Sequence, residues 1–295
     1  METQSAIPGY SITNEELHLF QELVHREAGI HLADSKRQLL VARLSRRLRA
    51  LGLRTFTEYH KYLMTSDASG EEHRHMLDCI TTNKTDFFRE KHHFDFLRDT
   101  VLPQVAQKTR GGVKRLRIWS AACSTGEEPY SIAITLLDAI GAHLSGWDIR
   151  ILASDIDTTV LATAEKGIYG VDRVAGLSDS TKHAHFLRGK GPSEGLVRVR
   201  PELSRLITFR RINLIEPTWP IRSEFDVIFC RNVVIYFNRD TQKTLFSRMA
   251  KLISPGGYLF VGHSENLFWM RDVFDVVQPT VYSPTAPAGG ARETP

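Results

Sequence analysis

The chain has little cysteine and no long apolar segment, and both shortages restrict what it can be. Its three cysteines, Cys79, Cys123 and Cys230, are far apart and flanked by small or apolar residues. We expect reduced thiols, because neither an even pairing nor a zinc-ligand spacing is present. No stretch approaches the ~20 apolar residues of a membrane helix, and the N-terminus (METQS) lacks a basic signal-peptide start. The sequence predicts a cytoplasmic protein without membrane insertion.

Metal-site signals are also missing. Histidines occur as the pairs His73/His75, His92/His93 and His183/His185, but no cysteine or acidic cluster accompanies them. We therefore expect solvated or core histidines and no bound metal. The nearby aromatic residues Phe87, Phe88, Phe94 and Phe96 are expected to pack between domains.

The composition is that of an ordinary globular protein. At 295 residues, with 42% hydrophobic and 24% charged residues, the chain is long enough for two domains. Its net charge of +4 favours acidic partners without showing where the charge lies.

The first region has a helical pattern. From Thr13 to about His93, apolar residues recur at three- and four-residue spacing, which predicts a helical domain with its linker over residues 10–92. Residues 36–51 are expected to form a basic helix, with Asp34-Ser35 as its N-cap and Gly52 as its stop. Opposite an apolar stripe, this helix carries Lys36, Arg43, Arg46, Arg47 and Arg49.

The second region, residues 93–285, alternates short apolar strands with helices. The expected strands are 115–121, 149–155, 207–212, 225–230 and 258–262, which predicts a parallel sheet with helices on both faces. An extra segment at about 169–205 contains a Gly-rich turn and the alternating run Leu196–Arg200, which predicts a small antiparallel insert. Residues 286–295 are rich in Pro, Gly and Ala and are expected to be a disordered tail.

The loop after the first of these strands, residues 120–130 (SAACSTGEEPY), predicts an adenosine site without a phosphate. Its small residues let a ligand approach the backbone. Its two glutamates at a helix N-terminus would repel a pyrophosphate, which argues against NAD, FAD and ATP. A ligand with adenosine and an ammonium group, such as S-adenosylmethionine (SAM), fits better. Asp155, at the end of the second strand, is suited to the ribose hydroxyls, whereas Asp157 is expected to cap a helix.

Several long motifs occur in one order. They are residues 81–90 (TTNKTDFFRE), 119–131 (WSAACSTGEEPYS), 153–157 (ASDID), 229–237 (FCRNVVIYF), Gly256-Gly257 and 262–266 (GHSEN). Together they closely resemble the CheR family, the glutamate methyltransferases of chemotaxis receptors, from the basic helix to about Tyr282. The resemblance implies an α/β fold, a class I SAM-methyltransferase (Rossmann-like) domain with a small antiparallel β-subdomain insert, preceded by an all-α N-terminal domain. Cys123, where a smaller residue is expected, is the one departure and adds a buried thiol.

The resemblance also implies the site residues. The cofactor-binding candidates are Asn83, Thr85, Arg89, Glu128, Asp155, Asn213, Leu214, Arg231 and Asn232. The first three would reach the amino acid portion of SAM, Glu128 its ammonium group, and Asn213 and Leu214 its adenine. Arg231, Asn232 and Tyr236 would close the site. Arg89 and Tyr236 are the catalytic candidates, through a guanidinium that holds a carboxylate and a hydroxyl near the methyl group.

By this resemblance the chain methylates receptor glutamates for chemotactic adaptation and leaves S-adenosylhomocysteine. A glutamate with a pKa of about 4.3 is already anionic at neutral pH, so no general base is needed. The expected partner is the cytoplasmic domain of the receptors, which would dock on the basic helix. The protein is expected to be a monomer that is recruited to receptor arrays. A receptor C-terminal peptide is expected to join an exposed, arginine-rich edge strand of the insert, near Arg188, Arg198 or Arg200.

Two alternatives stay open at this point. The basic helix could hold phosphates for a nucleic-acid methyltransferase, although residues 231–236 (RNVVIY) replace the Asn-Pro-Pro-Tyr loop of enzymes that methylate flipped bases. The chain could also be a SAM-sensing module without catalysis, which the intact Arg89 and Tyr236 disfavour.

Overall fold

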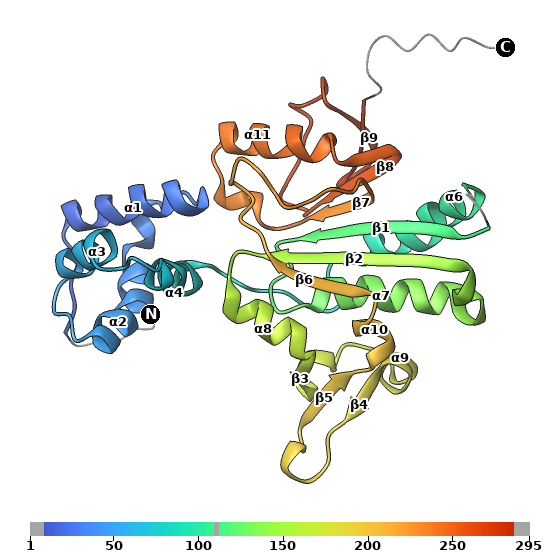
Figure 1. Cartoon of the computed structure of the whole chain (residues 1–295), viewed down its shortest axis with the longest axis horizontal. Helices are drawn as coiled ribbons and strands as arrows, with labels where there is room; N and C mark the ends of the chain where they lie inside the picture. Colours follow the sequence, from blue (N-terminus) through green and yellow to red (C-terminus); the bar gives the residue numbers. More distant parts are fainter. Residues whose placement is uncertain (1–8, 109–111, 286–295) are drawn as a thin grey trace, which may run out of the picture.

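The computed structural model describes residues 9–108 and 112–285, in two parts joined by an extended linker (Figure 1). The N-terminal part consists of α1 (Asn14–Ala28), α2 (Arg37–Leu51), α3 (Phe56–Thr65) and α4 (Glu71–Ile80). Their apolar faces enclose a core in which Phe20, Leu44 and Tyr59 are fully buried. This is the all-α domain that the sequence predicts.

Glu16 fixes the start of α1 within this bundle. Its carboxylate accepts a hydrogen bond of 2.9 Å from the backbone of Thr13, which completes a capping box. The other oxygen accepts the backbone N–H and the hydroxyl of Thr57, each at 2.8 Å. A single buried carboxylate thus joins α1 to α3.

Helix α2 begins differently from the prediction. A 3-10 turn, Asp34–Lys36, precedes it, and neither Asp34 nor Ser35 caps it, so the predicted N-cap is wrong. Asp34 instead accepts a hydrogen bond of 2.9 Å from Gln21 on α1. At the other end Gly52 adopts the left-handed conformation that was expected of it.

The cationic face of α2 is smaller than the sequence suggested. Arg47 turns inward and donates to Glu72 at 2.8 Å, on the carboxylate oxygen that also accepts the hydroxyl of Tyr59. Arg43 donates to the carbonyl of Thr81 at 3.0 Å and thereby ties α2 to the linker. Arg46 and Arg49 remain exposed on the helix.

The second part is built on a seven-stranded sheet of order β6-β2-β1-β7-β8-β10-β9. Its parallel strands are β1 (Lys114–Ala121), β2 (Trp147–Asp155), β6 (Ile207–Arg211), β7 (Phe225–Cys230) and β8 (Ile253–Val261). All five were predicted, although β8 starts earlier than expected. Two strands that were not predicted, β9 (Phe274–Gln278) and β10 (Val281–Pro284), extend the sheet: β10 pairs antiparallel with β8, and β9 pairs antiparallel with β10.

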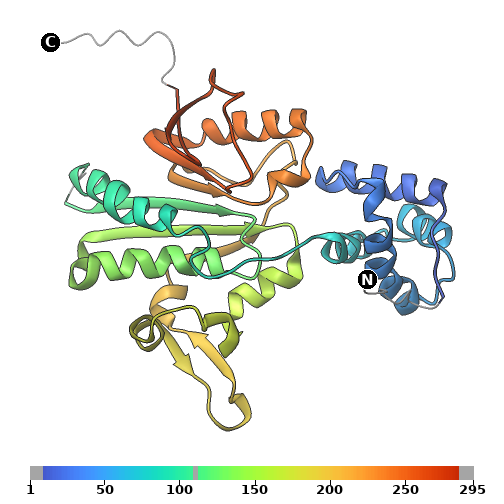
Figure 2. The ribbon, with the colours of Figure 1, turned by 180° about the vertical axis from the view of Figure 1, so that it is seen from behind.

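Helices cover both faces of this sheet (Figures 1 and 2). On one face, α5 (His92–Phe96), α6 (Leu102–Gln107) and α7 (Glu127–Ile140) contribute to one apolar cluster. On the other face, α11 (Arg239–Ala250) packs in a second cluster around Trp119. Helix α8 (Thr158–Lys166) follows β2. The class I methyltransferase architecture is confirmed.

The aromatic residues after the linker pack within this second part, so their predicted place between the domains is wrong. Phe94 stacks on Phe229 of β7 with ring centroids 6.0 Å apart, and Phe96 meets Phe260 of β8 at 5.7 Å. Phe87 contacts Phe186 at 5.5 Å. These residues pack there because the chain from Phe87 onward runs along the methyltransferase core rather than between the domains.

A small antiparallel sheet forms the predicted insert and protrudes from the main body (Figure 1). Its order is β3-β5-β4, from β3 (Ile168–Gly170), β4 (Phe186–Arg188) and β5 (Leu196–Val199), with α9 (Asp179–His185) and α10 (Pro201–Ser204) beside it. Because β5 pairs on both sides, the prediction that the arginine-rich strand lies at an edge is wrong. Arg188 lies on the edge strand β4, whereas Arg198 lies in the middle of the sheet.

All three cysteines are free, and Cys123 and Cys230 are buried. In residues 9–108 and 112–285 no helix combines the length and apolarity needed to cross a bilayer, and no group of three His, Cys, Asp or Glu is placed to hold a metal. The expected disordered tail, 286–295, lies outside the described residues.

Candidate functional site

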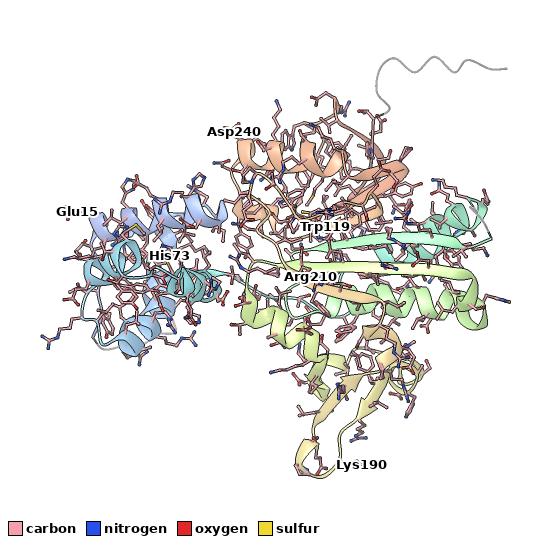
Figure 3. All side chains as sticks on the ribbon, viewed as in Figure 1. Glu15, His73, Trp119, Lys190, Arg210 and Asp240 are labelled. Atoms are coloured by element: carbon pink, nitrogen blue, oxygen red, sulfur yellow. The ribbon has the colours of Figure 1, made fainter. Side chains whose placement is uncertain are left out.

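A pocket of about 260 Å³ lies where the linker crosses the carboxyl ends of the parallel strands. The structure brings every predicted site residue to its wall. These are Asn83, Thr85, Arg89, Glu128, Asp155, Asn213, Leu214, Arg231, Asn232 and Tyr236. By contrast, His73 lies in the helical part (Figure 3), where its ring is 2.8 Å from Asp67.

The loop after β1 approaches this pocket with an unusual backbone. Ala122, Ser124 and Gly126 have positive φ angles of 65°, 50° and 96°. A Cβ on Gly126 would lie 2.8 Å from the Cβ of Ala164, so only glycine fits there. Non-glycine residues in this conformation are strained, and such strain clusters at functional sites. The loop turns the backbone N–H of Ser124 toward β2.

Asp155, at the end of β2, is a buried carboxylate with an exposed fraction of 6%. Its oxygens accept the backbone N–H groups of Ser124 at 2.8 Å and Asp157 at 3.0 Å. Burial raises its pKa to about 6 despite these bonds. No ion pair is formed by Asp155 with any described residue. A carboxylate has about four acceptor positions, so this one can accept further hydroxyl groups from the pocket.

Asp157 joins the linker to the methyltransferase domain. One oxygen caps α8, as predicted, by accepting the N–H of Thr159 at 2.9 Å and of Val160 at 3.1 Å. The other oxygen accepts the side-chain amide of Asn83 at 2.7 Å and the hydroxyl of Thr81 at 2.9 Å. The nitrogen of Asn83 is therefore committed to the protein, and its amide oxygen is the group left for a ligand.

Arg231 lies between two acids at the end of β7. Its guanidinium is 3.1 Å from Glu128 and 3.1 Å from Glu90, and it also donates to the carbonyl of Arg89. Burial raises the pKa of Glu128. For Glu90 burial acts in the same direction, but the charge of Arg231 and the hydrogen bonds from Arg231 and the backbone of His263 together outweigh it and lower the pKa. With both acids ionised, the cluster carries one net negative charge. A cationic ligand beside Glu128 would neutralise it.

The catalytic candidates are half-buried at the wall of the pocket. Arg89 donates one hydrogen bond of 3.0 Å to the carbonyl of Lys84, and none of the described acids pairs with it. Most of its guanidinium donors are therefore available to a carboxylate. Tyr236 is held through its backbone, whose carbonyl accepts the N–H of His31 at 2.8 Å. Thr85 is buried and supplies its carbonyl to Arg173 at 2.6 Å.

The helical domain forms a wall of the pocket that sequence reasoning missed. Asn213 donates from its side chain to the carbonyl of Glu27 at 2.7 Å, so the segment after β6 is fastened to the end of α1. Gly29 approaches so closely that a Cβ there would lie 2.6 Å from the side chain of Ile215. The pocket residues that were not predicted are Ala28, Ile30, His31, Leu32, Lys36, Leu39, Ile80, Thr81, Thr82, Lys84, Asp86, Ala122, Ser124, Ile156, Ile212, Val233 and Phe237. The signal available in the sequence was Gly29, which follows α1. A glycine at that position is equally expected when it only ends the helix.

Comparison with known proteins agrees with this geometry. The family model described as "CheR methyltransferase, SAM binding domain" matches residues 83–283, and "CheR methyltransferase, all-alpha domain" matches residues 15–81. Chemotaxis protein methyltransferase 2 of Pseudomonas aeruginosa is 46% identical over 275 residues, which cover 93% of this chain and 95% of that protein. The chemotaxis protein methyltransferase of Escherichia coli is 43% identical over 273 residues, 92% of each chain. The glycopeptide N-methyltransferase MtfA with bound SAM is more remote, with 14% identity and a TM-score of 0.32 over 61% of this chain and 51% of that one.

Proposed function

Because the chain belongs to the CheR family of SAM-dependent methyltransferases, we propose that it methylates glutamate side chains of chemotaxis receptors. The products are a glutamate methyl ester and S-adenosylhomocysteine. One observation carries the proposal: a single pocket between the two domains combines the buried carboxylate of Asp155, which has no ion pair among the described residues, the two acids around Arg231, and a guanidinium on Arg89 that pairs with none of the described acids.

These residues suit SAM better than a nucleotide with phosphates. Asp155 would accept both ribose hydroxyls, because its remaining lone pairs are not used by the protein. Glu128 would receive the ammonium group beside Arg231. The buried side chain of Leu214 and the neighbouring Asn213 would flank the adenine. Asn83, Thr85 and Asn232 would complete the contacts to the amino acid portion and the rim.

When bound, SAM supplies an electrophilic methyl group on a positively charged sulfur. The residues of the chain then have to align a glutamate carboxylate that is already ionised, so proton transfer is not required of them. Arg89 would hold that carboxylate by parallel hydrogen bonds, and Tyr236 would place its hydroxyl near the reacting oxygen. The wall from Ala28 to Leu32 would keep water out, which strengthens these charge interactions.

The exposed cations of α2 are the proposed docking face for the receptor. Arg46 and Arg49 are exposed, whereas Arg43 and Arg47 are engaged within the protein. Receptor helices that bear methylation sites present glutamates, and two exposed arginines would attract them. The enzyme is proposed to act as a monomer that is recruited to receptor arrays in this way.

The small sheet is proposed to bind the C-terminal peptide of a receptor. An extended peptide would add to the free edge of β4, beside Arg188, which suits an acidic side chain. Exposed Leu187 and Ile168 lie on the outer face of the sheet and would accompany an apolar peptide residue. Such tethering raises the local concentration of the enzyme to roughly millimolar for a flexible linker.

A methyl-transfer assay with labelled SAM separates this function from its alternatives. Label on purified receptor but not on DNA is the expected result. Label on DNA would indicate a nucleic-acid methyltransferase. SAM binding without label on either substrate would indicate a sensing module.

A further inference from the structure

Glu265 lies behind the loop that carries Arg231, Asn232 and Tyr236. It follows the end of β8, and its exposed fraction is 5%. One carboxylate oxygen accepts the backbone N–H of Asn232 at 2.8 Å and of Gly262 at 2.6 Å, and the other accepts the N–H of Val234 at 3.0 Å. No described lysine, arginine or histidine forms an ion pair with it. Among the residues that the structure describes, the hydrogen bonds to this buried acid therefore come from backbone amides.

Asn232 packs tightly against both Gly262 and Glu265. This residue has a φ angle of 58°, a left-handed conformation that asparagine tolerates better than most residues. Its side chain fills the space that a Cβ on Gly262 would need, and that Cβ would also lie 2.9 Å from the Glu265 carboxylate. The loop is thus held in an unfavourable backbone conformation by bonds from the end of the neighbouring strand.

We propose that Glu265 is a positioning residue for methyl transfer, which holds the loop from Arg231 to Tyr236 against the pocket without touching either substrate. This role rests on the proposed function, because the loop matters only if Tyr236 acts on a bound carboxylate. An ionised carboxylate suits the task since both of its oxygens accept hydrogen bonds. A glutamine would present one amino group to the same N–H groups and would lose at least one bond.

The test is Glu265→Gln, studied with saturating SAM and receptor. The kcat is expected to fall by tenfold or more, since a displacement of about 1 Å at a catalytic group costs on the order of 10²-fold. The SAM dissociation constant should stay within about threefold, because Asp155 at the end of β2 and Glu128 on helix α7 lie outside the loop that Glu265 holds. Glu265→Asp, which keeps the charge on a shorter side chain, should give an intermediate kcat.

Glu16→Gln is the matched control, because Glu16 is also a buried acid that accepts backbone N–H groups, at 2.9 and 2.8 Å, but lies in the helical domain. It should lower the melting temperature to a similar extent and leave kcat unchanged. If Glu265→Gln does not fold, Gly262→Ala disturbs the same contact and should lower kcat in the same way. A parent-like kcat in every folded variant at this contact would overturn the proposal. A parent protein that transfers no methyl group to the receptor would instead contradict the proposed function.

Discussion

The carboxylate of Asp155 accepts a hydrogen bond of 2.8 Å from the backbone N–H of Ser124. This bond joins the end of β2 to the strained loop after β1, so the acid is held in place at the wall of the pocket. A rigid acceptor loses little freedom when a ligand binds, which favours tight recognition of hydroxyl groups.

Asp155→Ala is therefore expected to weaken SAM binding much more than folding. Hydrogen bonds to a charged group contribute roughly 1.5–3 kcal/mol each, so losing the ribose contacts should raise the dissociation constant by about tenfold or more. Calorimetric titration of the folded variant checks this. Unchanged SAM affinity would remove Asp155 from the cofactor site.

The affinity for SAM should depend on pH through the same residue. Burial raises the pKa of Asp155 from 3.8 to about 6. The ionised form accepts both hydroxyls, so affinity should be full above pH 6 and fall by up to about tenfold per unit below it. The same shift means that ionisation of Asp155 destabilises the unliganded fold as pH rises through the window from 3.8 to about 6, because the unfolded chain releases this proton first.

Asp155→Asn is the control for this pH dependence, since it keeps the size of the side chain and cannot titrate. Its SAM affinity should be weaker and nearly flat from about pH 5 to pH 8. Equal pH dependence in the parent and the variant would assign the effect to another group.

Arg89→Ala should leave the fold intact, because its side chain makes one hydrogen bond to the linker and none of the described acids pairs with it. The methylation rate is expected to fall by about 10²-fold, the size found for losing one electrostatic positioning group. Arg89→Lys should rescue only part of the rate, since lysine lacks the planar fork. Steady-state kinetics of the three proteins check this, and an alanine variant near the parental rate would make Arg89 structural.

Reversal of Arg46 and Arg49 to glutamate should raise the Michaelis constant for the receptor and leave SAM affinity unchanged. The matched control reverses Arg205 and Arg210, which are also exposed, so both variants change net charge equally. Arg210 lies in β6 (Figure 3), and Arg205 lies two residues before that strand. The control should behave like the parent. If the two double variants had the same effect, general charge rather than α2 would attract the receptor.

Arg188→Glu should weaken binding of a peptide copied from a receptor C-terminus, because Arg188 lies on the free edge strand β4. Lys190→Glu, in the turn after β4 (Figure 3), is the matched charge control and should bind like the parent. Absence of saturable binding by the parent to any such tail, well above micromolar concentrations, would leave the small sheet as scaffold.

Sequence reasoning succeeded where local pattern determines position. Polar residues that follow parallel strands must meet at one edge of the sheet, so Asp155 and the loop of residues 120–130 could be placed together from the pattern, and Arg231 was added by the family resemblance. It failed where the answer depends on distant partners. The inward turn of Arg47 requires Glu72 on another helix, and an alternating run such as Leu196–Arg200 has the same pattern in a central strand as at an edge.

The role of Glu265 illustrates the same limit. In the sequence it is one acid in a short loop after a strand, and nothing nearby indicates that it accepts N–H groups from the loop around Asn232. The sequence also did not predict that the segment from Ala28 to Leu32 lines the pocket, because this segment reaches the pocket only through packing between the domains.

The central claim, methyl transfer to a glutamate oxygen, is tested most directly by the chemistry of the bond that forms. Purified receptor is incubated with the protein and methyl-labelled SAM, and the labelled receptor is then treated with mild base. A methyl ester is cleaved by base, so the account predicts that the label is released as volatile methanol from the parent reaction and that Arg89→Ala yields little label to release. Label that stays on the receptor after base treatment, as a methylated nitrogen would, contradicts the account.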